Sequence, residues 1–123
     1  MEERIAGSET HSFKLVCPDE AEGGLERQFV APAVEMMNEV ALITATRFAR
    51  KKMVCDGGDQ VRFIKAFCPD AIMELTGKVI EVSLTDLKVR VDVISEDMQE
   101  FSKEQKASGV FTFVAKKDIV GNV

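Results

Sequence analysis

Polar and apolar residues alternate along five stretches of the chain with the period of a β-strand. The first runs from His11 to Val16 and ends at a Cys-Pro-Asp turn, and the second is centred on Val61 and Phe63. The third is 71–82, which Gly77 interrupts, and the last is 110–115. The fourth is the clearest, because residues 87–93 alternate strictly between aliphatic and charged side chains. Each stretch is expected to form a strand with one buried face and one wet face.

Residues 29–49, between the first two strands, have a different pattern. Their apolar residues lie around most of a helix circumference, which predicts a long helix buried on nearly every side, with its methionines in the core. Pro32 lies near the start, where a first-turn proline is tolerated. Glu35, Glu39 and Arg47 interrupt the apolar run, which argues against a transmembrane span. The stretches 20–27 and 95–108 are polar or glycine-containing and are expected to be loops.

The order of elements, one strand, one long helix and then four strands, predicts an α+β fold. An antiparallel sheet that curls around a central helix satisfies a helix that is apolar on most sides. At 123 residues the chain fits a single domain, 1–123, whose ends at 1–9 and 118–123 are expected to fray. The open edges of such a sheet favour self-association, so we expect a dimer or a larger assembly.

The charge of the chain argues against a nucleic-acid partner. The formal net charge is −5, and the basic residues are scattered among acids, whereas phosphate neutralisation needs a basic face. The one basic run is Arg47, Arg50, Lys51 and Lys52. It is either a solvated helix end, where cations complement the helix dipole, or a contact for the phosphates of a nucleotide-like ligand.

The cysteines and the histidine do not form a metal-binding pattern. Cys17, Cys55 and Cys68 are an odd number at spacings that match no zinc motif, and the sequence carries no secretory signal. We expect reduced thiols and a cytoplasmic protein. His11 is the only imidazole, so a zinc site is not expected, and it is predicted to be exposed near a frayed start.

Four short motifs resemble one family. Phe63-Ile64-Lys65, Thr76-Gly77-Lys78-Val79, the strand 88–93 and the closing Phe111-Thr112-Phe113-Val114-Ala115 are similar to those of the hotdog acyl-CoA thioesterases, the acyl-CoA hydrolases, and the register is gapless from Phe29 to Val93. The resemblance implies the hotdog fold, hydrolysis of a coenzyme A thioester to free acid and coenzyme A at a groove between two subunits, and a trimer of dimers, a hexamer. It implies no cofactor and no metal, because the thioester itself is the substrate.

The catalytic motif of that family is altered in this chain. Relatives enter the helix through Phe-Gly-Gly, carry a Met-Asp pair whose aspartate is the catalytic carboxylate, and place an asparagine upstream. Counted from Phe29, the glycines fall on Val30 and Ala31, the aspartate on Asn38 and the upstream asparagine on Gly23, while Phe29 and Met37 are kept. An amide cannot act as a general base, and losing that role costs on the order of a hundred- to ten-thousandfold in rate.

Two residues remain as candidate catalytic groups. Asn38 either holds a water or the thioester carbonyl, or is a buried amide satisfied by the backbone. Glu35 lies one turn earlier on the same helical face, so it is either the replacement carboxylate or an exposed acid near the helix N-terminus. Glu39 points about 100° away and is the poorer candidate.

The expected coenzyme A path is also altered. Where relatives carry Gly-Arg-Ser/Thr-Ser after the third strand, this chain has Ser83-Leu84-Thr85-Asp86, which removes an arginine and adds an acid. Ser83, Leu84 and Thr85 are the candidate lining residues, and Lys65 and the run 50–52 are possible phosphate contacts. Gly57 and Gly58 mark either a plain bulge or a place where the pantetheine arm passes the backbone.

Three functions follow, in this order. The first is an acyl-CoA thioesterase, with activity weakened by the change at Asn38. The second is a non-catalytic subunit that binds acyl-CoA or is structural. The third, a hotdog dehydratase or hydratase, is expected to present a catalytic histidine beside an acid, and the chain offers only His11.

Overall fold

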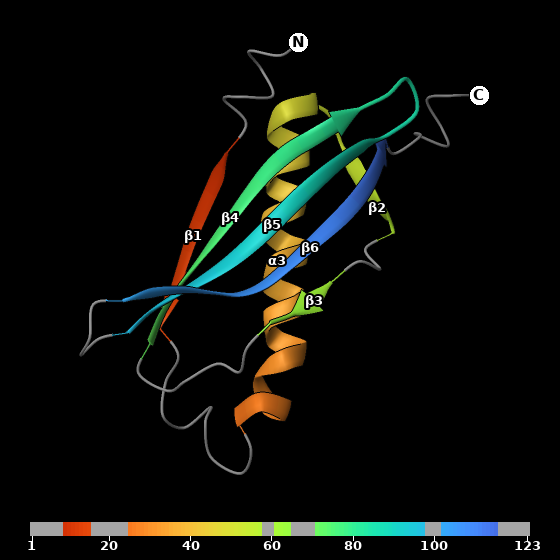
Figure 1. Cartoon of the computed structure of the whole chain (residues 1–123). Helices are drawn as coiled ribbons and strands as arrows, with labels where there is room; N and C mark the ends of the chain where they lie inside the picture. The colour runs from red at the N-terminus through yellow and green to blue at the C-terminus, as the bar shows by residue number, and fades with distance from the viewer. Residues whose placement is uncertain (1–8, 16–24, 58–60, 65–70, 98–101, 116–123) are drawn as a thin grey trace.

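The sheet and the helix are described by a computed structural model for residues 9–15, 25–57, 61–64, 71–97 and 102–115. In chain order the elements are β1 (Thr10–Leu15), α3 (Leu25–Ala49), β2 (Met53–Gly57), β3 (Arg62–Phe63), β4 (Ala71–Val82), β5 (Leu87–Asp97) and β6 (Lys103–Ala115). The described strands pair antiparallel in the order β1-β4-β5-β6-β2, and β3 also pairs with β6. Figure 1 shows this twisted sheet lying across one side of α3. The predicted sheet around a single helix is confirmed.

The core lies between the helix and the inward face of the sheet. Alternate residues of each long strand point to the helix, as the pleat requires. The buried apolar side chains of β4, β5 and β6 include Met73, Leu75, Val79, Val89, Val91, Val93, Phe111 and Phe113. They pack against one stripe of α3 formed by Ala33, Met37, Val40, Ala41, Ala45 and Phe48. The register of this packing fixes which helix residues remain outside the core.

The prediction of a helix buried on nearly every side is wrong. Leu42 and Ile43 are 40% and 41% exposed, and Glu35, Asn38 and Glu39 are exposed as well. The sheet covers only the stripe described above, so an apolar residue on the opposite side of the helix stays partly exposed. The helix also begins at Leu25, which places Pro32 in its interior and removes the N–H that would bond to the carbonyl of residue 28.

The strand predictions are confirmed in part. The strand 71–82 has the predicted bounds, and Gly77 continues it as a buried, paired residue opposite Val91. The predicted loop 95–108 is wrong, because β5 extends to Asp97 and β6 starts at Lys103. Main-chain pairing between these two strands holds polar residues such as Glu96 and Lys103 in the ladder. The predicted second strand is divided into β2 and β3.

The sequence predicted His11 to be exposed near a frayed start. Its side chain is indeed exposed, but it belongs to β1, paired with β4 at Thr76. It lies on the outward face of the sheet, opposite to α3, where Nδ1 is 2.9 Å from Glu74 Oε2 and Nε2 is 3.3 Å from Glu9 Oε2. The hydrogen bond to Glu74 raises the pKa of His11 above its usual value, partial burial lowers it, and Glu9 raises it further.

This arrangement predicts a small pH dependence of stability. Because the folded pKa of His11 lies above the unfolded one, its stabilisation is present below the unfolded pKa and is lost as the pH rises through the folded pKa. The urea midpoint of the wild type should exceed that of His11→Gln near pH 5.5, and the difference should vanish by about pH 8.5. Salt should reduce it, since the pair is exposed. A difference that is constant across this range would show that the ion pairs do not contribute.

Candidate active site

The two candidate catalytic residues lie on the open side of α3. Asn38 and Glu35 are both exposed and three residues apart, so their side chains share one face of the helix. The alternative in which Asn38 is a buried amide is wrong, because the sheet covers the other side of the helix. Leu42, four residues after Asn38, continues this face toward the C-terminal end, whereas Ile43, four residues after Glu39, lies on the adjacent face. The face therefore carries an amide and a carboxylate beside exposed aliphatic side chains.

The chain leaves α3 through a left-handed residue. Arg50 has φ 58°, and its N–H donates to the carbonyl of Thr46 at 2.8 Å, which caps the last turn. Such a conformation ends a helix and changes the direction of the chain, so Lys51 and Lys52 leave the helix axis before Met53 starts β2. Of the predicted basic run, Arg47 bonds Thr10 Oγ1 through Nη1 at 3.3 Å, and Lys51 reaches a cavity.

A compact turn joins β4 to β5 beside this helix end. The N–H of Ser83 donates to the carbonyl of Asp86 at 2.8 Å. Ser83 Oγ accepts the N–H of Thr85 at 3.3 Å and that of Asp86 at 3.1 Å, and it donates to Asp86 Oδ1 at 3.1 Å. This uses the single donor and both acceptor sites of the hydroxyl. Leu84 and Thr85 are therefore the side chains that the turn presents outward, and Leu84 is fully exposed.

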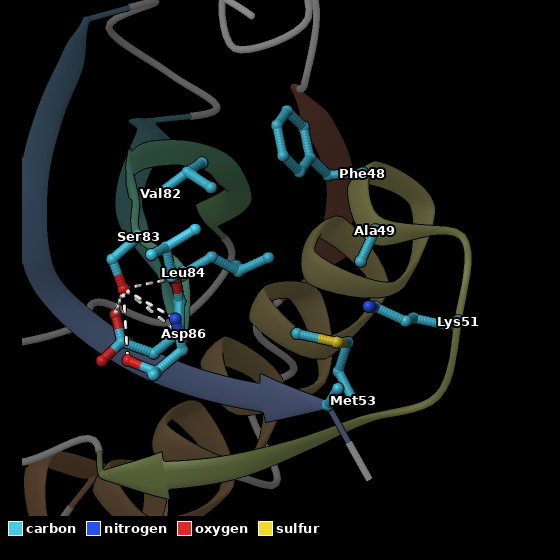
Figure 2. A pocket seen from close by; sticks show the side chains of 11 residues that line it. Phe48, Ala49, Lys51, Met53, Val82, Ser83, Leu84 and Asp86 are labelled. Carbon is cyan, nitrogen blue, oxygen red and sulfur yellow. Dashed lines mark hydrogen bonds between the residues drawn. The ribbon is translucent and has the colours of Figure 1, made fainter. Parts of the chain in front are cut away.

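Between the helix end and this turn lies a cavity of about 230 Å³. Figure 2 shows the side chains around it, which come from the end of α3, the start of β2 and the β4–β5 turn. Its lining is mostly apolar, with Lys51 and Asp86 as the charged members: Phe48, Ala49, Lys51, Met53, Val82, Ser83, Leu84, Thr85, Asp86, Leu87 and Ala115. The structure thus brings together the predicted residues Ser83, Leu84 and Thr85 with Lys51 of the basic run.

The structure does not bring Asn38 and Glu35 to that cavity. Ala49, at the cavity, lies eleven positions after Asn38 on the helix, which at the rise of an α-helix is roughly 16 Å. Gly57 ends β2, and a bulge falls between Cys55 and Gly57, in agreement with the predicted bulge. Gly23, Gly58 and Lys65 lie outside the described residues. Within the described part of the chain, no group of His, Cys, Asp and Glu side chains is arranged to hold a metal ion, and no helix is long and apolar enough to cross a membrane.

The sequence predicts Cys55 to be a reduced thiol. This residue lies on β2 opposite Phe113, whose buried side chain faces α3, so the two side chains are on the helix side of the sheet. Its thiol is exposed.

Comparison with known proteins gives structural relatives but no match in sequence families. No family model matches the chain, and no curated protein matches it. An acyl-CoA hydrolase from Bacillus cereus superposes with a TM-score of 0.84 at 26% identity, over 93% of this chain and 69% of the other. The acyl-CoA hydrolase from Staphylococcus aureus, in complex with butyryl coenzyme A, coenzyme A and coenzyme A disulfide, gives 0.82 at 23% identity over the same shares. The hexameric thioesterase from Yersinia pestis gives 0.75 at 18%, over 87% and 86%.

The Staphylococcus aureus enzyme has also been characterised as three single alanine variants. They replace an asparagine, an aspartate and a threonine at positions 28, 43 and 60 of that chain. The aspartate thus follows the asparagine by 15 positions, and the threonine follows the aspartate by 17. The present chain, with one helix against a curled antiparallel sheet, therefore has the hotdog fold, in the form that these acyl-CoA hydrolases and thioesterases share.

Proposed function

We propose that the chain is an acyl-CoA thioesterase, which hydrolyses a coenzyme A thioester to the free acid and coenzyme A in a groove beside α3 at a subunit interface. The observation that carries the proposal is the likeness to the Bacillus cereus acyl-CoA hydrolase, which extends over 93% of the chain. The residues of the site add support because they lie on the exposed side of α3 and around the neighbouring cavity.

Asn38 takes the position of the aspartate in this site. The assignment follows from the resemblance, because counting from Phe29 places the family's aspartate on Asn38. An amide at that position donates a hydrogen bond to the thioester carbonyl or holds a water, but it takes no proton. Glu35, on the same exposed face, is the carboxylate that could take the proton instead. We therefore expect turnover that is slower than with an aspartate.

The cavity near the helix end suits the coenzyme A portion of the substrate. Coenzyme A is a long ligand with its thioester at one end and phosphates toward the other, so one molecule can contact groups roughly 16 Å apart along a helix. The apolar walls accept an uncharged part of the ligand, and the Lys51 ammonium is the cation available to a phosphate. We assign Leu84 and Thr85 to direct contact with the ligand. The Ser83 hydroxyl instead makes hydrogen bonds to Asp86 that stabilise the turn.

Lys51→Ala should raise the KM for acyl-CoA about two- to fivefold and leave kcat unchanged, because it removes one partly exposed charge interaction. Lys52→Ala is the matched control, since Lys52 is the next residue, is exposed and does not line the cavity. Steady-state kinetics of both variants decide the point. Equal effects of the two substitutions would mean that only the general charge of the surface matters.

We also propose self-association, as a dimer or a trimer of dimers. Val54 on β2, Phe63 on β3 and the adjacent Ile64 are large apolar residues exposed along one edge of the sheet. Such an edge is a template for pairing with another strand, and the Yersinia pestis relative is a hexamer. A mass of two or six chains in light scattering supports this assembly, and a monomer at micromolar concentration rejects it.

The second candidate is a non-catalytic subunit that binds acyl-CoA. Asn38 favours it, because the position lacks the carboxylate that hydrolysis requires. A dehydratase is disfavoured, since His11 lies on the sheet face opposite to α3.

A panel of short- to long-chain acyl-CoA substrates, assayed for thiol release with binding measured in parallel, separates the two candidates. Saturable release supports the thioesterase. Binding without release from any substrate supports the non-catalytic subunit instead.

A further inference from the structure

We propose that a hollow on the outward face of the sheet, opposite to α3, binds a carboxylate that carries an aliphatic chain. The hollow has a volume of about 550 Å³ and is lined by residues of β3, β4, β5 and β6. Its polar side chains are Arg62, Arg90 and Ser108, and its apolar ones are Val61, Ile80 and Val110. The proposed reaction uses the other side of the sheet, so this is a separate site.

The register of the sheet places the polar side chains of the hollow on one face. Arg90 lies between two buried valines of β5, so it points away from α3. Ser108 lies between two buried residues of β6 and points the same way. Arg62 pairs with Ser108, and paired residues project from the same face of a sheet. Ser108 also pairs with Asp92, two positions after Arg90, so these side chains come from neighbouring strands that are about 5 Å apart.

These side chains offer hydrogen-bond donors that the described part of the chain does not use. Arg62 is exposed, and among the described residues neither its guanidinium nor the Ser108 hydroxyl has a partner. Arg90 donates through Nε to Asp92 Oδ1 at 3.1 Å, and Gln105 Nε2 donates to the same oxygen at 2.8 Å. These two bonds orient the Arg90 guanidinium and leave its two terminal nitrogens for a ligand.

The charge balance of the hollow favours a ligand with a single negative charge. Arg62 and Arg90 carry two positive charges, and Asp92 compensates one of them, which leaves one. None of the side chains that line the hollow is acidic, although the whole chain has a net charge of −5. A guanidinium binds a carboxylate through two parallel hydrogen bonds. A phosphate group carries roughly 1.5 to 2 negative charges at neutral pH, so the single remaining charge matches a carboxylate better.

The apolar side of the hollow accepts the aliphatic chain of the acid. Ile80 lies at the bulge of β4, between Val79 and Glu81, and is 45% exposed. A bulge inserts an extra residue and re-aims a side chain, and here the side chain lines the hollow together with Val110. A volume of about 550 Å³ is typical of a site for a small organic molecule. Two guanidinium groups beside exposed aliphatic carbons therefore fit an acid with a hydrocarbon tail.

The free acid that the proposed thioesterase releases belongs to this chemical class. That link rests on the proposed function, whereas the binding of a carboxylate in the hollow does not. The sheet separates the hollow from the exposed side of α3, which carries Asn38. A bound acid and a bound coenzyme A should therefore occupy the same chain together.

Calorimetric titration of the full chain with octanoate, with and without saturating coenzyme A, tests the site. We expect one octanoate per chain under both conditions. Arg62→Ala should weaken the binding about three- to tenfold, because it removes a charge-assisted hydrogen bond from a partly exposed site. Lys88→Ala is the matched control, since it removes the same charge from β5 but does not line the hollow, and it should change the affinity less than about twofold. Ile80→Ser should weaken octanoate more than butyrate, because the shorter acid covers less of the aliphatic wall.

The outcomes separate this site from the proposed thioesterase. Octanoate that does not bind at millimolar concentration, or that binds Arg62→Ala and Lys88→Ala equally, overturns the site and leaves the thioesterase untouched. Displacement of octanoate by coenzyme A would mean that the acid binds in the reaction groove instead, and tighter binding of octyl phosphate would overturn the choice of a carboxylate. If the wild type releases no thiol from acyl-CoA, the thioesterase is rejected while the octanoate titration still decides the site. Arg62→Gln replaces Arg62→Ala if circular dichroism shows that the alanine variant misfolds.

Discussion

Asn38→Asp is expected to raise kcat for acyl-CoA hydrolysis by about a hundredfold or more. The substitution restores a carboxylate at the position where the hotdog acyl-CoA hydrolases resembled by this sequence carry one. A positioned general base is worth roughly a hundred- to ten-thousandfold in rate. Asn38 is exposed on α3, so a carboxylate there pays no burial penalty and costs little stability. Steady-state kinetics with the preferred acyl-CoA measure the gain, and the rise should appear in kcat rather than in KM.

Two matched variants determine how Asn38→Asp is interpreted. Glu39→Asp changes an exposed acid on the next helix position and should have no effect on the rate. Glu35→Ala, made in the wild type, tests whether the base has moved by one turn. If Asn38→Asp leaves the rate unchanged while Glu35→Ala abolishes it, the catalytic carboxylate is Glu35 and the assignment of Asn38 as the lapsed position is wrong.

Gly77→Ala is expected to lower the free energy of unfolding by about 1–3 kcal/mol, because it overpacks a close contact between helix and sheet. A Cβ at this position would lie 2.5 Å from Thr44 Oγ1 and 2.9 Å from Val40 Cγ1. Thr44 is buried, and its hydroxyl donates to the carbonyl of Val40 at 2.8 Å, so it cannot rotate away without losing that bond. Urea unfolding measures the change.

Gly109→Ala provides a graded control on the neighbouring part of the same sheet. Its Cβ would meet Val61 Cγ2 at 3.1 Å and Met37 Cε at 3.2 Å, and the flexible methionine end can give way. We expect a smaller loss than at Gly77. Thr44→Ala combined with Gly77→Ala should recover part of the loss, since the nearest clashing atom is then gone. A Gly77 variant as stable as the wild type would mean that the helix does not approach the sheet this closely.

Strands in which buried and exposed residues alternate strictly were predictable from the sequence. Strand segments that are held only by main-chain pairing were not. Residues 71–82 alternate between buried and partly exposed positions along most of their length, so both the strand and its inward face follow from the sequence. The start of β6 does not alternate, because Lys106 and Ala107 are both buried where the register with β5 shifts between Gln105 and Ala107. A bulge breaks the period of two, and the polar residues before it then resemble a loop.

The site was predictable only as far as the resemblance extended. It indicated Asn38 and the turn at Ser83, Leu84 and Thr85, but the geometry of that turn, with the Ser83 hydroxyl fully bonded, appears only in the structure. The exposed side of α3 was missed, because periodicity gives a helix its apolar residues without showing which of them the sheet covers. Leu42 and Ile43 are apolar residues of the helix that the sheet leaves exposed.

The central claim, that this hotdog chain hydrolyses acyl-CoA, is tested most directly by the fate of water oxygen. The chain is incubated with its preferred acyl-CoA in ¹⁸O-labelled water, and the acid product is analysed by mass spectrometry. We expect free acid that carries the label, in an amount equal to the coenzyme A released. Acyl-CoA that stays intact while bound, or an acyl group that appears on another acceptor without labelled acid, would contradict the claim.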